Sequence, residues 1–215
     1  MKQLRMALPA FVLLLTACSA PAPVQGSPTA EAAVPVADLL SVTAPGAVPA
    51  ASYGLTTASG ARITFTLPTP VVDPAVAAID AYRAKVGAAP VSYLVADVDN
   101  RAGTAPVNLY TVNAFSEEGR QSTFTSVADA LHSWAPTFSY DFGWSMNGKS
   151  LDEEQGAALK CEANNLYNAD IADVDTAERT TVILASPDAE LPTEFTRVAV
   201  QPSVTGGEEE AHPLR

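Results

Sequence analysis

The sequence predicts a mainly β fold: an antiparallel sandwich of two sheets with one inserted helix and a possible second, short helix. Three observations support this class. Short segments with alternating apolar residues recur between residues 62 and 200, and turns that contain glycine separate them. One segment has the apolar spacing and both end signals of a helix. The region 53–204 is long enough for one domain with a packed core.

The first elements of this region are a strand and the helix. In RITFTL, residues 62–67, strict alternation places the three apolar residues on one face. In VDPAVAAIDAYRAKVG, residues 72–87, Asp73 can cap a helix, Pro74 suits its first position, and apolar residues follow at helical spacing. The second, shorter helix is predicted at SVADALHSW, residues 126–134.

Further strands follow on both sides of the short helix. VSYLVADV, VNLYTVNAF and RQSTFTSV, residues 91–98, 107–115 and 120–127, have the pattern of an antiparallel meander with turns between them. TTVILA and FTRVAV, residues 180–185 and 195–200, supply the closing strands. These segments are rich in β-branched and aromatic residues, which favour strands.

A resemblance supports the sandwich. The run from Val91 to Val127 consists of a strand that ends in Asp-Asn, a Gly/Thr/Pro turn, a second strand, a Glu-Gly hairpin and a third strand. It is similar to the telokin-like, immunoglobulin-type domains of actinobacterial lipoproteins and secreted antigens. The resemblance implies an immunoglobulin-like β-sandwich over residues 53–204, and it implies no catalytic residue.

The N-terminus has the layout of a secretory signal peptide. Lys2 and Arg5 precede an apolar stretch of residues 6–15, and small residues lead to Cys18. The apolar stretch is too short to span a bilayer, which takes roughly 20 residues. An ordinary cleaved signal or a short anchor helix is the alternative at this point.

Four residues make the interpretation more specific. Leu15, Thr16, Ala17 and Cys18 match the lipobox of bacterial lipoproteins. This resemblance implies that residues 1–17 are removed and that the Cys18 sulfur receives a diacylglyceryl group, so the protein would face outward from the cell membrane. Two acyl chains hold a protein firmly at a bilayer, whereas one binds reversibly.

Composition predicts how the lipid is joined to the domain. Residues 18–52 carry the lipidated Cys18 and are rich in Ala, Pro and Ser, so we expect a disordered tether that lacks a core. Residues 205–215, rich in Gly and Glu, are expected to form a disordered acidic tail. With Cys18 used by the lipid, Cys161 is not expected to form a disulfide within the chain.

Charge excludes one class of partner. The chain has 12 basic and 24 acidic residues, and without Lys2 and Arg5 there remain 10 basic residues, which gives a net charge near −14. Nucleic acid is therefore not an expected partner, because binding it depends on basic patches that neutralise phosphates. The expected partners are the membrane, through the lipid, and an envelope protein or glycan.

The segment WAPTFSYDFGW, residues 134–144, is rich in aromatic residues. Phe138, Tyr140, Phe142 and Trp144 recur at period two, so a single strand would place all four on one face. The preferred interpretation is that this face is core, with Phe138 and Phe142 buried between the sheets. The alternative is an exposed platform for a glycan, peptide or lipid, with Trp134, Tyr140 and Trp144 as possible contacts.

Catalytic patterns in the sequence are weak. His132 lies three residues after Asp129, a helical neighbour, and no second histidine lies in a segment expected to be ordered. We expect no catalytic residue, no metal and no cofactor. The leading hypothesis is a lipid-anchored binding or interaction module of the cell envelope that is not an enzyme. The alternatives are an envelope hydrolase that uses His132 with a nearby carboxylate, and a structural or antigenic surface lipoprotein without a small ligand.

Overall fold

The computed structural model describes residues 51–169, 173–192 and 194–214. The chain divides into two compact units, residues 1–40 and 41–215. The first unit lies outside the described residues, and with it the predicted signal peptide, Cys18 and most of the predicted tether. All described residues belong to the second unit.

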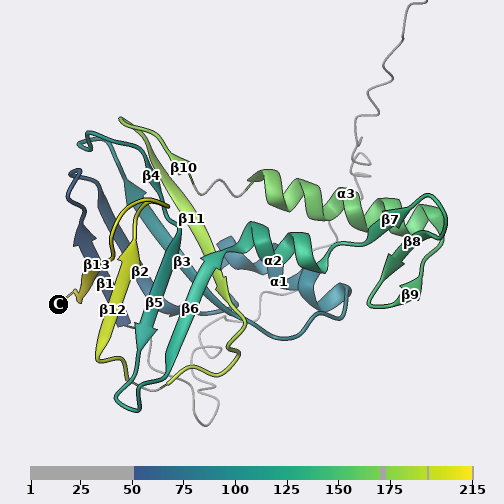
Figure 1. Cartoon of the computed structure of the whole chain (residues 1–215), viewed down its shortest axis with the longest axis horizontal. Coiled ribbons are helices and arrows are strands. Elements are labelled where there is room, and N and C mark those ends of the chain that lie inside the picture. Colours follow the sequence, from purple (N-terminus) through teal and green to yellow (C-terminus); the bar gives the residue numbers. More distant parts are fainter. Residues whose placement is uncertain (1–50, 170–172, 193, 215) are drawn as a thin grey trace, which may run out of the picture. The chain divides into compact units, whose positions relative to one another are not determined.

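Eight antiparallel strands of this unit close into a barrel (Figure 1). A mainly β, antiparallel fold is therefore confirmed, but the strands form one closed barrel where the sequence predicted two packed sheets. Around the barrel the strands are β1 (Ala51–Thr56), β13 (Glu209–Pro213), β12 (Arg197–Gln201), β5 (Thr111–Phe115), β6 (Gln121–Ser126), β11 (Arg179–Ser186), β3 (Ser92–Asp99) and β2 (Arg62–Thr69).

Strand β13 is the element that turns an open sheet into a barrel. It pairs with β1 on one side and with β12 on the other, so neither of these two strands is left as an edge. The prediction of a disordered tail over residues 205–215 is wrong for this strand. Apolar patterning does not reveal this strand, because Ala211 is its only buried residue and the adjacent residues are polar or charged.

Apolar side chains fill the interior of the barrel. The predicted face of β2 is confirmed, since its alternate residues Ile63, Phe65 and Leu67 are all buried. Small barrels are filled in this way by inward-facing side chains from every strand. The other strands contribute further members of this core: Leu94, Ala96, Val98, Val112, Ala114, Phe124, Val182, Leu184, Val198 and Val200.

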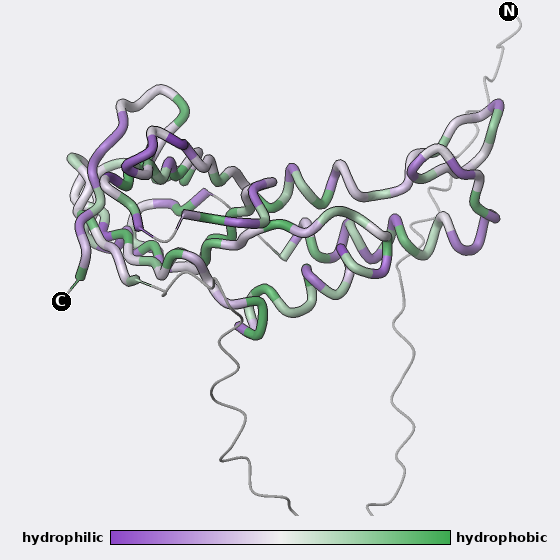
Figure 2. The backbone as a smooth tube through the Cα atoms, turned by 90° about the horizontal axis from the view of Figure 1, so that it is seen from below, coloured by the Kyte–Doolittle hydropathy of each residue, from purple (hydrophilic) through white to green (hydrophobic). Residues whose placement is uncertain are grey.

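Three helices lie beside the barrel: α1 (Pro74–Lys85), α2 (Val127–Trp134) and α3 (Glu153–Ala169) (Figures 1 and 2). The two predicted helices are confirmed together with their caps. The Asp73 carboxylate accepts a hydrogen bond from the backbone N–H of Ala75, 2.9 Å away, and the Ser126 hydroxyl accepts one from that of Ala128, 3.2 Å away.

Helix α3 was not predicted. It buries only Gly156, Leu159 and Ala163, so it lacks a conspicuous apolar stripe. Cys161 in this helix is disulfide-bonded, so the expectation that it forms no disulfide is wrong. None of the helices in the described part of the chain is long and apolar enough to cross a membrane.

The helices and the barrel share a second apolar core. Tyr93, Ile183 and Ala185 point outward from strands β3 and β11 and are covered by residues of the three helices. Two hydrogen bonds connect these elements. The Tyr82 hydroxyl of α1 donates to the Leu159 carbonyl of α3 at 3.3 Å, and the Tyr93 hydroxyl of β3 donates to the Asp80 carboxylate of α1 at 3.2 Å. The helix side of this core comprises Val76, Ile79, Tyr82, Val86, Val127, Leu131, Ala135, Leu159 and Ala163.

Two small sheets complete the fold. Strands β4 (Val107–Asn108) and β10 (Asp173–Val174) form a two-stranded ladder. Strands β7 (Thr137–Ser139), β8 (Gly143–Met146) and β9 (Lys149–Ser150) form a three-stranded sheet that precedes α3. Figures 1 and 2 agree that this sheet lies at the end of the helices that points away from the barrel.

Candidate functional site

The aromatic segment forms a hairpin instead of one strand. Strand β7 ends at Ser139, the chain turns through residues 140–142, and β8 returns from Gly143, whose φ is +69°. The expected burial of Phe138 and Phe142 is therefore wrong. Phe138 is 52% exposed, Tyr140 98% and Phe142 83%. We call residues 137–146 the aromatic hairpin.

Three rings of the aromatic hairpin form a continuous column. Trp144 is partly buried at its base, where it packs so closely on Gly156 of helix α3 that a Cβ atom there would lie 2.3 Å from the Trp144 Cγ. Phe138 is the cross-strand partner of Trp144, and their ring centroids are 5.1 Å apart. The ring centroids of Tyr140 and Phe138 are 5.5 Å apart, and the two rings are nearly perpendicular. The helix therefore supports a chain of ring contacts that ends in solvent.

The predicted contact residues have different positions. Tyr140 is almost fully exposed and Trp144 is partly buried against Phe138, whereas Trp134 ends helix α2 and packs against the helix core. The exposed rings of Phe138 and Phe142 were missed as contacts. The signal that could have found them is Asp141 followed closely by Gly143, two residue types that favour tight turns.

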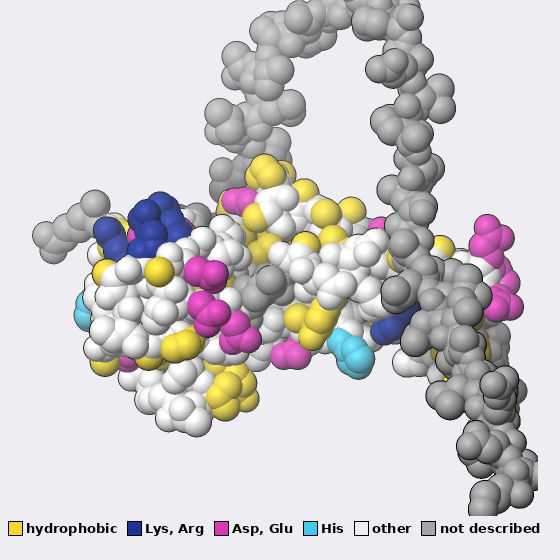
Figure 3. Space-filling model, turned by 90° about the horizontal axis from the view of Figure 1, so that it is seen from above, with side chains coloured by type: hydrophobic (Ala, Val, Ile, Leu, Met, Phe, Trp, Pro, Cys, Tyr) yellow, Lys and Arg dark blue, Asp and Glu magenta, His cyan; other side chains and the backbone are white. Residues whose placement is uncertain are grey.

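Acidic side chains accompany the aromatic hairpin. Asp141 is exposed within the turn, and Asp152, Glu153 and Glu154 are exposed at the start of α3, immediately after β9. Figure 3 shows acidic side chains at this end of the molecule, on the right of the view. A partner of the hairpin must therefore tolerate negative charge.

The residues considered for catalysis are not brought together. His132 is exposed in the last turn of α2, and within the described ranges it forms no ion pair with a carboxylate. In the same ranges, no group of three or more His, Cys, Asp or Glu side chains is placed so that it could hold a metal ion. Asp129 is likewise exposed on the first turn of that helix.

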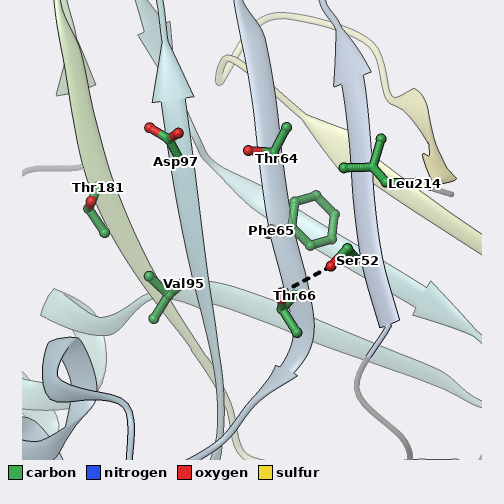
Figure 4. Close-up of a pocket in the computed structure, with 8 residues that line it drawn as sticks. All are labelled: Ser52, Thr64, Phe65, Thr66, Val95, Asp97, Thr181 and Leu214. Carbon is green, nitrogen blue, oxygen red and sulfur yellow. Dashed lines mark hydrogen bonds between the residues drawn. The ribbon is translucent and has the colours of Figure 1, made fainter.

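A second candidate lies on the outer face of the barrel, where sequence reasoning predicted no site. Beyond the area that the helices cover, strands β1, β2, β3 and β11 expose a groove with adjoining hollows of about 300 and 390 Å³, the first of which is drawn in Figure 4. We call it the barrel groove. Its lining is formed by Ser52, Arg62, Thr64, Thr66, Val95, Asp97, Asp99, Arg101, Arg179, Thr181 and Leu214.

Strand register sets the order of side chains in the barrel groove. Thr64 on β2 and Thr181 on β11 both lie opposite Asp97 on β3. Two residues further along β3, Asp99 lies opposite both Arg62 and Arg179. The exposed face of the sheet thus passes from hydroxyl groups to charged groups with distance from the helices.

Two arginines of the groove are held in fixed orientations. Arg101 donates from Nε and Nη2 to the two carboxylate oxygens of Asp99, at 2.9 and 2.7 Å. Arg179 binds Asp97 in the same two-pronged way, at 2.9 and 2.6 Å. Hydrogen bonds from these guanidinium groups hold the pKa values of Asp97 and Asp99 below their usual range, so both carboxylates are ionised at neutral pH.

Comparison with known proteins gives no further guide to function: no family model, no curated protein and no solved structure matches the chain. The resemblance to telokin-like lipoprotein domains therefore stays a prediction. The candidate sites are defined by their geometry alone.

Proposed function

We propose that the protein is a lipid-anchored binding module of the cell envelope and that the aromatic hairpin contacts its partner. The observation that carries this proposal is the exposure of Tyr140 and Phe142, at 98% and 83%, on a hairpin whose base is packed against a helix. Contiguous exposed apolar patches usually mark interaction sites.

The construction of the hairpin supports a binding role. Trp144 and Phe138 hold the base and the middle of the column, and Tyr140 contacts Phe138, so the Tyr140 ring needs little further ordering when a partner arrives. Rigid aromatic residues supply a large contact area at a low cost in conformational entropy, and they dominate the energetics of many interfaces. The anchor and the outward-facing location rest on the lipobox at Leu15–Cys18.

The alternatives have less support. A hydrolase would require His132 beside a carboxylate, and the exposed position of His132 on α2 does not favour this arrangement. A structural lipoprotein without a ligand would have no use for a stack of exposed rings. The binding module therefore remains the proposal, and the absence of enzymatic activity remains an expectation.

A photo-crosslinking experiment in the native envelope tests the proposal. A photoreactive phenylalanine replaces Tyr140 in one version of the lipidated protein and Tyr110 in another, because Tyr110 is a 48% exposed tyrosine on the barrel. We expect a discrete cross-linked product from position 140 and none from position 110. Equal labelling from both positions, or no product from position 140, would overturn the proposal.

Substitutions of the exposed rings test whether they are needed for binding. The double variant Tyr140→Ala/Phe142→Ala should fail to capture the partner that the wild type captures. Tyr167→Ala, which removes a 50% exposed ring from helix α3, should capture it normally. Thermal melts of both variants show whether the fold is retained.

A further inference from the structure

We propose that the barrel groove is a second binding site, specific for a sugar that bears a carboxylate or a phosphate group, with Arg62 as the residue that binds the anionic group. This inference is independent of the proposed function, because the groove is built from β1, β2, β3 and β11 and shares no residue with the aromatic hairpin.

The barrel groove carries more positive than negative charge. The larger of its two hollows, of about 390 Å³, is lined by Arg62, Arg101, Arg179, Asp97 and Asp99, together with Thr64. Three guanidinium groups face two carboxylates there, in a chain with twice as many acidic as basic residues. Figure 3 shows basic side chains gathered over this end of the barrel. The groove is thus a local excess of positive charge on an acidic protein.

Arg62 has no carboxylate partner in the groove, because both carboxylates are paired with the other two arginines. Asp97 and Asp99 are each occupied on both oxygens, by Arg179 and Arg101. Within the described ranges Arg62 forms no ion pair, although the strand register places it opposite Asp99. Its guanidinium retains five N–H donors in a planar fork, which matches the geometry of a carboxylate or a phosphate.

Hydroxyl groups lie next to Arg62 in the barrel groove. Thr64 and Thr181 make no side-chain hydrogen bond to another described residue, and Ser52 and Thr66 share only a long one, at 3.4 Å between their oxygens. In Figure 4 these side chains stand along one face of neighbouring strands, with Leu214 and Val95 beside them. Hydroxyl groups can donate to and accept from sugar hydroxyls, and the apolar side chains can contact the C–H face of a sugar ring.

Together these features define the ligand class. A guanidinium at one end binds the anionic group, and a row of hydroxyls next to it binds a polyhydroxylated body. Hollows of about 300 and 390 Å³ fit a ligand of one or two sugar rings, at the lower end of the usual range for small-molecule sites. A simple anion would use only the Arg62 end, and a neutral sugar would use only the hydroxyls.

Calorimetric titration of the full chain at low ionic strength tests the inference with four probes: glucuronate, glucose 6-phosphate, glucose and inorganic phosphate. We expect glucuronate or glucose 6-phosphate to bind at least tenfold more tightly than either glucose or inorganic phosphate. The stronger of the two identifies the anionic group. If neither binds more tightly than inorganic phosphate, the site is not a sugar site and the inference is wrong.

Substitutions locate the binding. Arg62→Gln should weaken the preferred probe at least tenfold, because hydrogen bonds to charged groups are the strong ones. Arg120→Gln removes the same charge at the β5–β6 turn and should leave binding unchanged. Thr64→Val should weaken the sugar probe severalfold without changing the affinity for inorganic phosphate. Equal affinities of the Arg62→Gln and wild-type proteins would overturn the assignment, and thermal melts confirm that each variant is folded.

Discussion

Replacing Gly156 by alanine tests how the aromatic hairpin is held. Gly156 lies in the first turns of α3, and a Cβ atom there would be 2.3 Å from the Trp144 Cγ and 2.4 Å from its Cβ. Ordinary van der Waals contacts between carbon atoms lie near 3.5 to 4.0 Å. The methyl group therefore forces the base of the hairpin away from the helix.

Two effects of this substitution oppose each other. Overpacking of a close contact typically costs about 1–3 kcal/mol, and a conflict with two atoms of the hairpin places the cost in the upper part of that range. Alanine in place of glycine favours a helix by up to about 1 kcal/mol. The net destabilisation is about 1–2 kcal/mol, equivalent to a fall of roughly 2–8 °C in melting temperature for a chain of this size.

The assay combines thermal melts with fluorescence. In a Trp134→Phe background Trp144 is the only tryptophan, since the chain has two, so its emission reports the base of the hairpin. Gly156→Ala should lower the melting temperature and shift the Trp144 emission toward that of an exposed indole. In a Trp144→Gly background, which removes both conflicting atoms, the same substitution should become stabilising.

This change of sign is the decisive result. If Gly156→Ala raises the melting temperature of the otherwise unmodified protein, or has the same effect in both backgrounds, Trp144 does not rest on α3. The support for the aromatic column would then be lost.

Three further predictions concern stability and lipidation. Phe142 is 83% exposed, so Phe142→Ala should change the free energy of unfolding by no more than about 0.5 kcal/mol. Phe124→Ala in the barrel core should lower it by about 3–5 kcal/mol. Urea titrations compare the two variants, and a large loss for Phe142→Ala would show that its ring is buried. Burial raises the pKa of Tyr82 to about 12 and also raises that of Tyr93. The folded-state pKa of each tyrosine lies above the unfolded value near 10. The free energy of unfolding is therefore unaffected by these tyrosines below about pH 10. Above that pH it falls by about 1.4 kcal/mol per pH unit for each tyrosine. Unfolding curves between pH 9 and 12 should show this slope, and Tyr82→Phe should make it shallower; a flat profile would contradict the burial. Cys18→Ser should abolish the lipid, and mass spectrometry of the unreduced membrane fraction should find diacylglyceryl on wild-type Cys18; an unmodified N-terminus would contradict the lipobox.

Elements with signals at both ends were predicted well from the sequence. Helix α1 has a capping Asp73, a proline at its first position and Gly87 just beyond its end, so its bounds follow from local chemistry. Strand β2 was equally clear, because alternation persists over its whole length and every alternate side chain is buried. In both cases the local preference and the tertiary packing agree.

The aromatic hairpin was misread because alternation alone does not reveal a change of direction. Phe138 and Trp144 do share a face, but as partners across a turn, whereas Tyr140 and Phe142 belong to the turn itself. Alternation at period two does not distinguish a single strand from a hairpin. The residues that do distinguish them are Asp141 and Gly143, which favour a turn.

The barrel groove could not be found in one sequence. Arg62, Asp99 and Arg179 lie far apart in the chain, and they become neighbours only because β3 pairs with β2 on one side and β11 on the other. Closure of the barrel was hidden for a related reason, since β13 buries Ala211 alone and its pairing depends on backbone hydrogen bonds. Register is a property of the whole sheet, and it is not written in either strand separately.

The position of β13 also shapes how the domain acquires its fold. The strand is synthesised after every other strand of the barrel, yet it must pair with β1, the first of them. This contact of very high sequence separation makes closure a late and slow event. Until it occurs, β1 and β12 each have an unpaired edge, and at high protein concentration the β13 of a second molecule can pair with them in place of the molecule's own. A few residues near the C-terminus thus determine the kinetic competition between a closed monomer and a strand-exchanged assembly.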